Sequence, residues 1–252
     1  MKQFIRAIRS EVYKAVHSSV ILIHLVVPLI GMAAFLAYYT ISPWGEQDKV
    51  SAYLQVLAMA FPLLIGIVTV IIAEQEVQAA SCQMLLSTPC KRYIPHFAKL
   101  SVILIFGFFA SIIAVFGFGI VFRRMENVVF PLSFYIKSAM LLFFGNQTLY
   151  ILQYLVSFAL GKGAGLGLGI VESLLSALLV TGLGDRIWTS MPWSIAIRFA
   201  SMFAESKVRD VPFAIMPGVT QGMIYIWVTS VILLLMLAYW SVKWDGRKNE
   251  MN

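Results

Sequence analysis

Charge is the scarcest feature of this sequence. Only 12% of its 252 residues are Asp, Glu, Lys or Arg, and 60% are hydrophobic, whereas a soluble domain carries about 25% charged residues. This shortage excludes an ordinary water-soluble domain and indicates an integral membrane protein. The net charge of +7 does not indicate a nucleic-acid partner, because the bases lie mostly between apolar runs, where membrane topology and anionic lipid account for them.

Cysteine and histidine are also scarce. The two cysteines, Cys82 and Cys90, cannot build a disulfide framework, and their spacing does not fit a zinc site. The three histidines, His17, His24 and His96, are scattered, and the sequence offers no hydrolytic triad or metal cluster. We therefore expect no enzyme activity, metal or cofactor in this chain.

A phosphate-binding loop is missing as well. The glycine-rich stretch 161–169 (GKGAGLGLG) places Lys162 near its start, with no Ser or Thr after it, so it fails the P-loop pattern. Its alternate glycines instead allow helices to approach closely, or give a flexible entry to a span. If the protein works against a gradient, the energy must come from a partner or from coupled ions.

The sequence is rich instead in apolar runs, each of about 21–23 residues, long enough at about 1.5 Å per residue to cross a hydrocarbon core of about 30 Å. The six candidate spans are residues 18–40, 52–73, 100–122, 138–160, 163–183 and 220–242. We therefore expect an all-α integral membrane fold in one transmembrane domain, residues 1–252. The segments expected inside hold eleven Lys and Arg residues, among them Lys14 and Lys99, against eight outside, which predicts cytoplasmic termini.

Residues 1–17 predict an amphipathic helix that lies on the membrane surface, with its bases toward anionic head groups. One arc of about 120° holds the apolar side chains Phe4, Ile5, Ile8, Val12, Ala15 and Val16. The alternative is the plain start of a longer first span. The segment lacks a compact apolar core followed by a small-residue cleavage site, so we expect no signal peptide.

A polar segment, residues 74–92, separates the second and third spans. It opens with acids, carries apolar residues at helical spacing, and closes with a proline that stops a helix. Its candidate functional residues are Glu74, Glu76, Met84, Leu85 and Pro89. The segment is either an ordinary cytoplasmic loop or a short helix that docks Met84 and Leu85 into a groove on a cytosolic protein.

The loop 184–219 is too apolar for a solvated loop and too interrupted to span the bilayer. Trp188, Trp193 and Phe199 give it a large apolar surface, and aromatic residues favour the membrane interface. A short helix lying on the outer surface fits this composition. Its aromatic residues either pack against the protein's own spans or contact an amphiphile at the outer leaflet.

Polar residues within the spans are few. Glu172 is the only acid inside a span, and Asn146, Gln147 and Gln153 lie in the fourth span. A charge at mid-membrane costs at least about 2.5–3.5 kcal/mol, which makes Glu172 a candidate functional residue. The alternative is a structural hydrogen bond to a fourth-span amide. The sequence shows no internal repeat of the kind found in secondary transporters.

These features together resemble a known family. The N-terminal helix, the six spans and the EQE…LLSTPCKRY segment are similar to the membrane subunit of a type-2 ABC exporter. More narrowly, AFPLLIGI (60–67), AEQE (73–76), LLSTP (85–89), GLGD (182–185) and IW…PWSIAIRF (187–199) resemble the lantibiotic-immunity permeases of the G-subunit type.

The resemblance implies that residues 74–92 form a coupling helix that contacts a cytosolic ABC ATPase dimer, which would bind ATP and Mg²⁺. A second, related permease chain would complete the transporter. It would remove cationic antimicrobial peptides from a bacterial cell membrane. The alternatives are an exporter of another amphiphile or an ion, and an intramembrane enzyme or secondary transporter that needs no ATPase.

Overall fold

The computed structural model describes residues 2–79, 82–88, 90–126 and 130–246, and these residues contain no strand. The helices are α1 (Lys2–Val16), α2 (Ser19–Tyr39), α3 (Glu46–Gln78), α4 (Gln83–Leu86), α5 (Tyr93–Met125), α6 (Leu132–Leu160), α7 (Lys162–Leu179), α8 (Pro192–Val208) and α9 (Val219–Lys243). Three short 3₁₀ turns flank α8, namely η1 (Gly182–Gly184), η2 (Trp188–Ser190) and η3 (Phe213–Ile215). The all-α fold class is confirmed.

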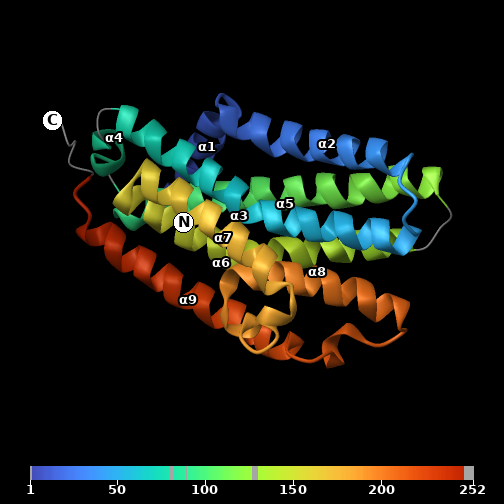
Figure 1. The fold of residues 1–252 in the computed structure, drawn as a ribbon. Coiled ribbons are helices and arrows are strands. Elements are labelled where there is room, and N and C mark those ends of the chain that lie inside the picture. Colours follow the sequence, from blue (N-terminus) through green and yellow to red (C-terminus); the bar gives the residue numbers. More distant parts are fainter. Residues whose placement is uncertain (1, 80–81, 89, 127–129, 247–252) are drawn as a thin grey trace.

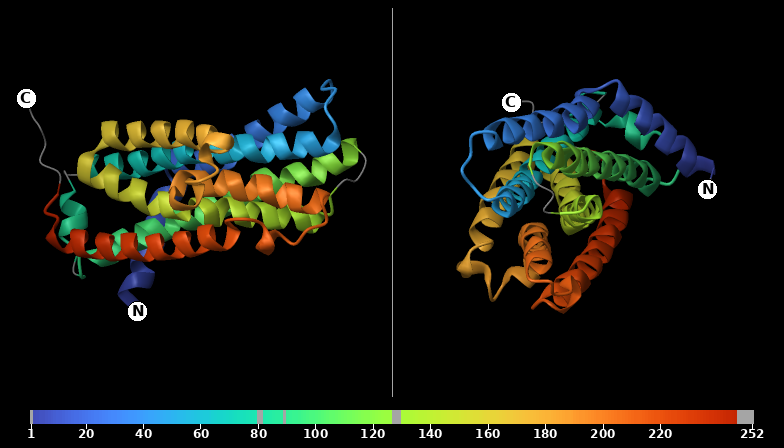
Figure 2. Two further views of the ribbon diagram at one scale, coloured as in Figure 1. Left: turned by 60° about the horizontal axis from the view of Figure 1, so that its bottom comes forward. Right: turned by 90° about the vertical axis from the view of Figure 1, so that its right-hand side faces the viewer.

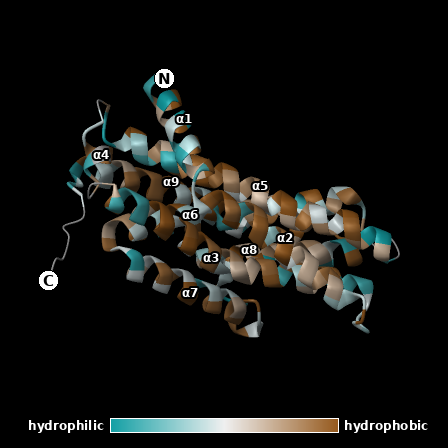
Figure 3. Cartoon of the chain, turned by 90° about the horizontal axis from the view of Figure 1, so that it is seen from above, coloured by the Kyte–Doolittle hydropathy of each residue, from teal (hydrophilic) through white to brown (hydrophobic). Residues whose placement is uncertain are grey.

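Six of these helices, α2, α3, α5, α6, α7 and α9, are long and apolar enough to cross a membrane. They form one elongated bundle (Figure 1). We call the end that holds α4 and the last turn of α9 the α4 end, and the opposite end the far end. Hydrophilic residues gather at both ends, and hydrophobic residues cover the length between them (Figure 3). The six expected spans are confirmed, although α3 and α5 continue to 33 residues each.

The N-terminal helix α1 is separate from α2. Ser18 lies between them with an extended backbone (φ −129°, ψ 170°), and its hydroxyl accepts a hydrogen bond from the N–H of Val20, which caps the start of α2. This excludes the alternative of one longer first span. α1 turns Glu11 and Ala15 toward the bundle and leaves Ile5 exposed. Contact of α1 with a membrane surface stays a prediction.

Glycines let α7 cross α3 closely. A Cβ at Gly169 would lie 3.1 Å from the carbonyl oxygen of Pro62, and one at Gly165 would lie 2.5 Å from the Val70 side chain. Small residues are what such a close helix crossing requires. At Gly163 and Gly167, an added Cβ would have no neighbouring atom within 4 Å. Of the four alternate glycines from position 163 to 169, two therefore serve the close approach expected from the sequence.

The sequence suggested a short helix lying on the outer surface, but α8, the helix within the loop after α7, packs inside the bundle. α7 extends from the α4 end to about the middle of the bundle, and α8 continues from there toward the far end (Figure 1). Ala196 of α8 lies against Gly145, and Phe203 stacks on Phe134 with ring centroids 5.2 Å apart, so α8 runs antiparallel along one half of α6. Seen end-on, α8 lies between α7 and α9 (Figure 2).

The apolar residues of α8 explain this position. Ile195, Ala196 and Ile197 are consecutive and all buried, so the helix is apolar all round near its start and has to be enclosed by other helices. Packing against the protein's own helices is therefore the correct alternative for the buried aromatic residues Trp188 and Phe199, whereas contact of Trp193 with an amphiphile stays a prediction.

One arginine joins α7 to α8. Arg198 Nε donates to the carbonyl of Leu179 at 2.8 Å, and its second nitrogen donates to the carbonyl of Thr181 at 2.6 Å. Arg198 also pairs with the Asp185 carboxylate at 2.8 Å. The last carbonyls of a helix lack partners within the helix and carry partial negative charge. Arg198 satisfies them and so fixes the point at which α7 ends.

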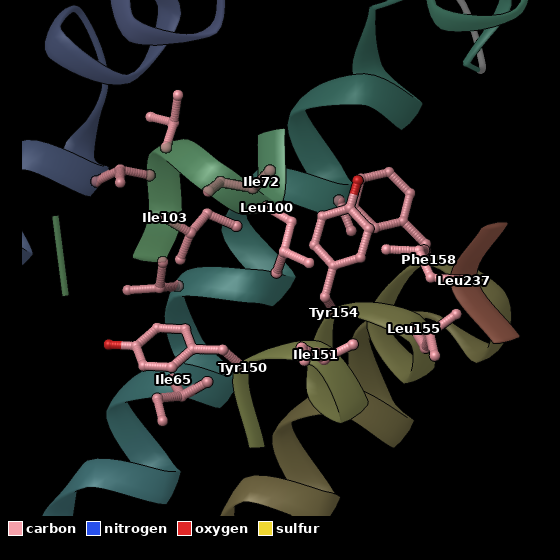
Figure 4. Close-up of a cluster of buried hydrophobic side chains, with 14 of the residues drawn as sticks. Ile65, Ile72, Leu100, Ile103, Tyr150, Ile151, Tyr154, Leu155, Phe158 and Leu237 are labelled. Carbon is pink, nitrogen blue, oxygen red and sulfur yellow. The ribbon is translucent and has the colours of Figure 1, made fainter. Parts of the chain in front are cut away.

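The largest hydrophobic cluster lies toward the α4 end. Figure 4 shows Ile72 of α3, Leu100 of α5, Tyr154 of α6 and Leu237 of α9 in this cluster, and all four are buried. Since α3 and α5 both contribute to it, the cluster links these two helices through their side chains.

Candidate functional site

The segment expected to be a coupling helix is short and packs onto the bundle. α4 is one turn, Gln83–Leu86, and Cys82 precedes it with a positive φ of 67°. Leu85 is 5% exposed and belongs to the largest hydrophobic cluster. The prediction that Leu85 forms an exposed docking face is therefore wrong, because its side chain is part of the chain's own core. Pro89 and the side chain of Met84 lie outside the described residues.

Polar side chains cover the outside of this segment. Gln83, Ser87 and Lys91 are exposed. Arg92 donates to the carbonyl of Trp244 at 3.2 Å and pairs with the Asp245 carboxylate at 2.7 Å. The surface at the α4 end is therefore polar and partly basic, and the segment is attached to the end of α9.

Four charged side chains from three helices meet close to α4. Lys99 of α5 contacts Glu76 of α3 at 2.8 Å and also contacts Glu11 of α1. Lys14 of α1 lies 2.9 Å from Glu76 and 3.0 Å from Glu11. We call these residues the four-charge cluster. The backbone N–H of Cys82 donates to the carbonyl of Glu76 at 2.8 Å, so the cluster adjoins the start of α4.

The position of Glu76 changes its expected role. The side chains of Glu76 and Lys99 are each 4% exposed, and a buried charge left without its partner is strongly destabilising. Glu76 therefore joins α3 to α1 and α5, and its carboxylate is not available on the surface for contact with a partner. Glu74, the other acid of the segment, is partly exposed.

Lys14 is the exposed member of the four-charge cluster, with 44% of its side chain accessible. Burial lowers the pKa of its ammonium group, but the Glu11 and Glu76 carboxylates outweigh this effect and hold the pKa above its ordinary value. Lys14 is therefore charged at neutral pH, and the cluster balances two bases against two acids.

A second, partly buried ion pair joins the same two helices at the far end. Lys49 of α3 contacts Glu126 at the end of α5 at 2.6 Å, and the same ammonium donates to the carbonyl of Tyr39 at 3.1 Å. The Tyr39 hydroxyl in turn donates to the carbonyl of Lys49 at 2.7 Å. This pair fixes the α2–α3 connection against the end of α5.

Glu172 lies between these two charged sites. Its side chain is 0% exposed and accepts a hydrogen bond from Nε2 of Gln153 on α6. The same Nε2 donates to the carbonyl of Pro62 on α3 at 2.9 Å. A hydrogen bond to a fourth-span amide, one of the two alternatives, is therefore present. Along α3, Pro62 is 13 residues from Lys49 and 14 from Glu76, so the contact lies near the middle of that stretch.

The two other polar residues predicted within the spans have separate partners. Asn146 Nδ2 donates to the carbonyl of Leu142 in its own helix at 2.9 Å. Gln147 Nε2 donates to the hydroxyl of Ser230 on α9 at 3.2 Å. Gln147 thus serves the contact between α6 and α9.

The aromatic residues predicted as candidate substrate contacts differ in accessibility. Trp188 and Phe199 are 5% and 1% exposed, and their ring centroids lie 6.1 Å apart. Both belong to a small hydrophobic cluster with Val219 and Ile226. Trp193 is partly exposed. Only Trp193 of the three can therefore meet a ligand without rearrangement, and its role as a contact stays a prediction.

An apolar cavity of about 180 Å³ lies between α2, α3 and α5. Its lining includes Val27, Gly31, Leu57 and Leu64, and His24 and Tyr150 supply the only side chains with polar atoms. An engineered apolar cavity of about 150 Å³ stays dry and binds benzene. A cavity of this size and lining is suited to one apolar group.

Within the described ranges, no three His, Cys, Asp or Glu side chains are grouped closely enough to hold a metal ion. The most enclosed histidine, His96, lies with Nδ1 2.9 Å from the Tyr154 hydroxyl and packs against the Phe158 and Trp240 rings. It serves the packing at the α4 end.

A comparison of the sequence with protein-family models identifies the family of this chain. Residues 7–178 match the model described as ABC-2 family transporter protein, which is more than half of the 252-residue chain. The chain belongs to this family. It is therefore the membrane transport subunit of an ABC exporter, a multi-pass permease, and membership implies association with an ATPase subunit. No curated protein sequence matches the chain.

The matched part of this ABC-2 permease contains residues that the sequence analysis missed. Glu11 was not selected, and Lys14 and Lys99 were counted only toward membrane topology, yet the three complete the four-charge cluster with Glu76. The sequence holds one signal for each acid–base partner. Glu11 is the only acid of α1 and borders its apolar arc, next to Phe4 and Ala15 at helical spacing, and Lys99 directly precedes a long apolar run.

Proposed function

We propose that this permease removes lantibiotics or similar cationic antimicrobial peptides from a bacterial cell membrane, and so gives the cell immunity or resistance. Family membership supports the exporter part of the proposal. The sequence resemblance to lantibiotic-immunity permeases and the apolar cavity support the substrate class. The alternative is an exporter permease for another amphiphile, such as a drug or a lipid, or for an ion.

The apolar cavity is the observation that carries the proposal. It lies among three helices that are long and apolar enough to cross a membrane. An ion needs polar ligands, and this lining offers only His24 and Tyr150, so the cavity favours an amphiphile over an ion. Pockets for drug-sized ligands measure about 300–1,000 Å³. A lantibiotic would therefore place one apolar group here, while its charged part stays at the membrane interface.

The coupling part of the proposal concerns residues 74–92. A cytosolic ATPase dimer, which binds ATP and Mg²⁺, contacts the polar surface around Gln83, Ser87 and Lys91. Movement then passes through Glu76 to α1 and α5, because the four-charge cluster joins these helices. In this arrangement both termini are cytoplasmic, α1 lies at the membrane interface, and a second, related permease chain completes the transporter.

The test is a survival assay with the complete transporter, including its ATPase and partner permease. Gly31 lines the cavity, and a Cβ there has no atom within 4 Å, so Gly31→Phe is chosen to place a ring in the cavity. Filling the site excludes an apolar group whose burial is worth about 1.5–3 kcal/mol. We expect the concentration of lantibiotic that inhibits growth to fall by about tenfold or more.

Gly163→Phe is the matched control, because a Cβ at Gly163 also has no atom within 4 Å and this glycine lies on α7, away from the cavity. It should leave protection unchanged at equal protein abundance. Full protection by Gly31→Phe would contradict the role of the cavity. Protection by the wild type against a drug or lipid, but against no lantibiotic in the panel, would favour the alternative substrate class.

A further inference from the structure

The buried acid of α7 has no basic partner. Glu172 is 0% exposed, and none of the ion pairs found among the described residues includes it. Its one hydrogen-bond donor is the amide of Gln153, which is shared with the carbonyl of Pro62. This differs from Glu76, which has two ammonium groups around it.

The elements packed against α7 offer no cation at this position. α3 has no charged residue from position 50 to 73, and α6 has only Lys137, near its far-end start. Arg198 of α8 is bound to the carbonyl of Leu179 and to Asp185. The tyrosines of α6 that are nearest in sequence to Gln153 are Tyr150 and Tyr154, and the Tyr154 hydroxyl bonds with His96. η1 carries no ionisable side chain.

Three oxygen atoms around the contact are buried without a hydrogen-bond partner. They are Glu172 Oε1, Gln153 Oε1 and Ser176 Oγ. An ionised carboxylate accepts about four hydrogen bonds and needs compensation when it is buried, whereas the neutral acid has one O–H donor of its own. Glycines at positions 66, 165 and 169 bring α3 and α7 close together. This leaves no room between the two helices for a further side chain that could compensate a negative charge on Glu172.

We propose that Glu172 is a proton-binding site, and that the neutral acid holds α7 against α3 and α6 in this packing. The proton resides on the carboxyl group, whose hydroxyl serves a neighbouring buried oxygen. When the α3–α7 crossing opens, water enters, the O–H bond breaks, the proton passes to water, and the carboxylate remains. A permease driven by ATP would then bind and release a proton as its helices repack.

The direct test is infrared spectroscopy of the purified protein in lipid nanodiscs at neutral pH. The wild type should show the C=O band of a protonated carboxylic acid, and Glu172→Gln should lose it. Glu205→Gln is the matched control, because Glu205 is a partly exposed acid paired with Arg209, and it should keep the band. A wild-type spectrum without a band that Glu172→Gln removes would overturn the proposal.

A second measurement tests the proposal independently in case the infrared C=O band is weak. A group that keeps its proton in the fold and loses it in water stabilises the fold at low pH, and this contribution is lost as pH rises. The thermal midpoint of the wild type should therefore fall relative to that of Glu172→Gln between mildly acidic and mildly alkaline pH. A difference between the two proteins that does not change with pH would show that Glu172 does not bind a proton.

Discussion

At the α4 end, α3 supplies the acid Glu76 and α5 the base Lys99, whereas at the far end α3 supplies the base Lys49 and α5 the acid Glu126. Positions 49 and 76 are 27 residues apart, and so are positions 99 and 126, which corresponds to about 40 Å of helix. A bilayer measures about 40–45 Å with its head-group regions. The two pairs therefore tie α3 to α5 near the two surfaces of the membrane.

The two ends differ in what else they hold. The far-end pair involves one further backbone carbonyl, and the Glu126 side chain is 25% exposed. The pair at the α4 end is 4% exposed on both sides and binds α1 through Glu11 and Lys14. The far-end pair thus links two spans and their loops. At the α4 end the four-charge cluster links three helices, and we call this link the three-helix joint. Through it, a movement next to α4 can reach α1, which is not one of the spans.

The largest expected effect comes from removing the base at the centre of that joint. Lys99→Met leaves the buried carboxylates of Glu76 and Glu11 without their shared buried partner. Breaking a buried pair in this way costs about 3–5 kcal/mol. We expect a large fall in the free energy of unfolding, measured by denaturation of the purified protein in lipid, and a loss of ATPase coupling in the assembled transporter.

Two further variants separate the charge from the packing of Lys99. Lys137→Met removes an exposed base of α6 and should change stability little. Adding Glu76→Gln to Lys99→Met removes one of the stranded charges and should restore part of the loss. If the double variant is as unstable as Lys99→Met, the cost comes from the shape of the lysine and not from its charge.

An intermediate effect is expected at the far end. Lys49→Met leaves the Glu126 carboxylate and the Tyr39 carbonyl without this donor, but Glu126 is 25% exposed and water can reach it. The loss should be about 1–3 kcal/mol, smaller than for Lys99→Met, and transport should keep its coupling to ATP hydrolysis. If Lys49→Met is stable but transport is no longer coupled to ATP hydrolysis, then both ends serve coupling and the two ends do not differ in this function.

The composition of the sequence was sufficient to predict most of the fold. Six apolar runs predicted six spans, because a bilayer requires long apolar helices. The runs could not show that α3 and α5 continue beyond the apolar region to positions 46–78 and 93–125. α8 was misplaced for a related reason. Aromatic content favoured a surface helix, whereas the consecutive apolar residues at positions 195–197 already indicated burial on all sides.

The candidate site was harder to predict, because its contacts join distant parts of the chain. Lys14 and Glu76 are 62 residues apart, and Lys99 and Glu11 are 88 residues apart. The sequence indicated Glu76 only as a candidate functional residue at the end of an apolar run, and only the packing of three helices shows its partners. Glu172 was recognisable from sequence, since an acid inside a span is unusual, but its pairing with Gln153 required the structure.

The smallest effect is expected for Lys14, although it contacts the same two acids as Lys99. Its side chain is 44% exposed, so water and salt already screen it, and pairs at such positions are worth about 0–1 kcal/mol. Lys14→Met should therefore cost less than about 1 kcal/mol.

The pH dependence of this cost follows from the pKa of Lys14, which Glu11 and Glu76 raise in the folded protein. The stability that Lys14 contributes is therefore complete below about pH 10.4, the ordinary lysine pKa. It is lost only as pH rises through the folded-state pKa. The difference in unfolding free energy between the wild type and Lys14→Met should consequently stay constant between pH 6 and 8. A difference that changes in this window would mean that another member of the four-charge cluster titrates there. A loss as large as that of Lys99→Met would mean that the joint depends on its exposed base as much as on its buried one.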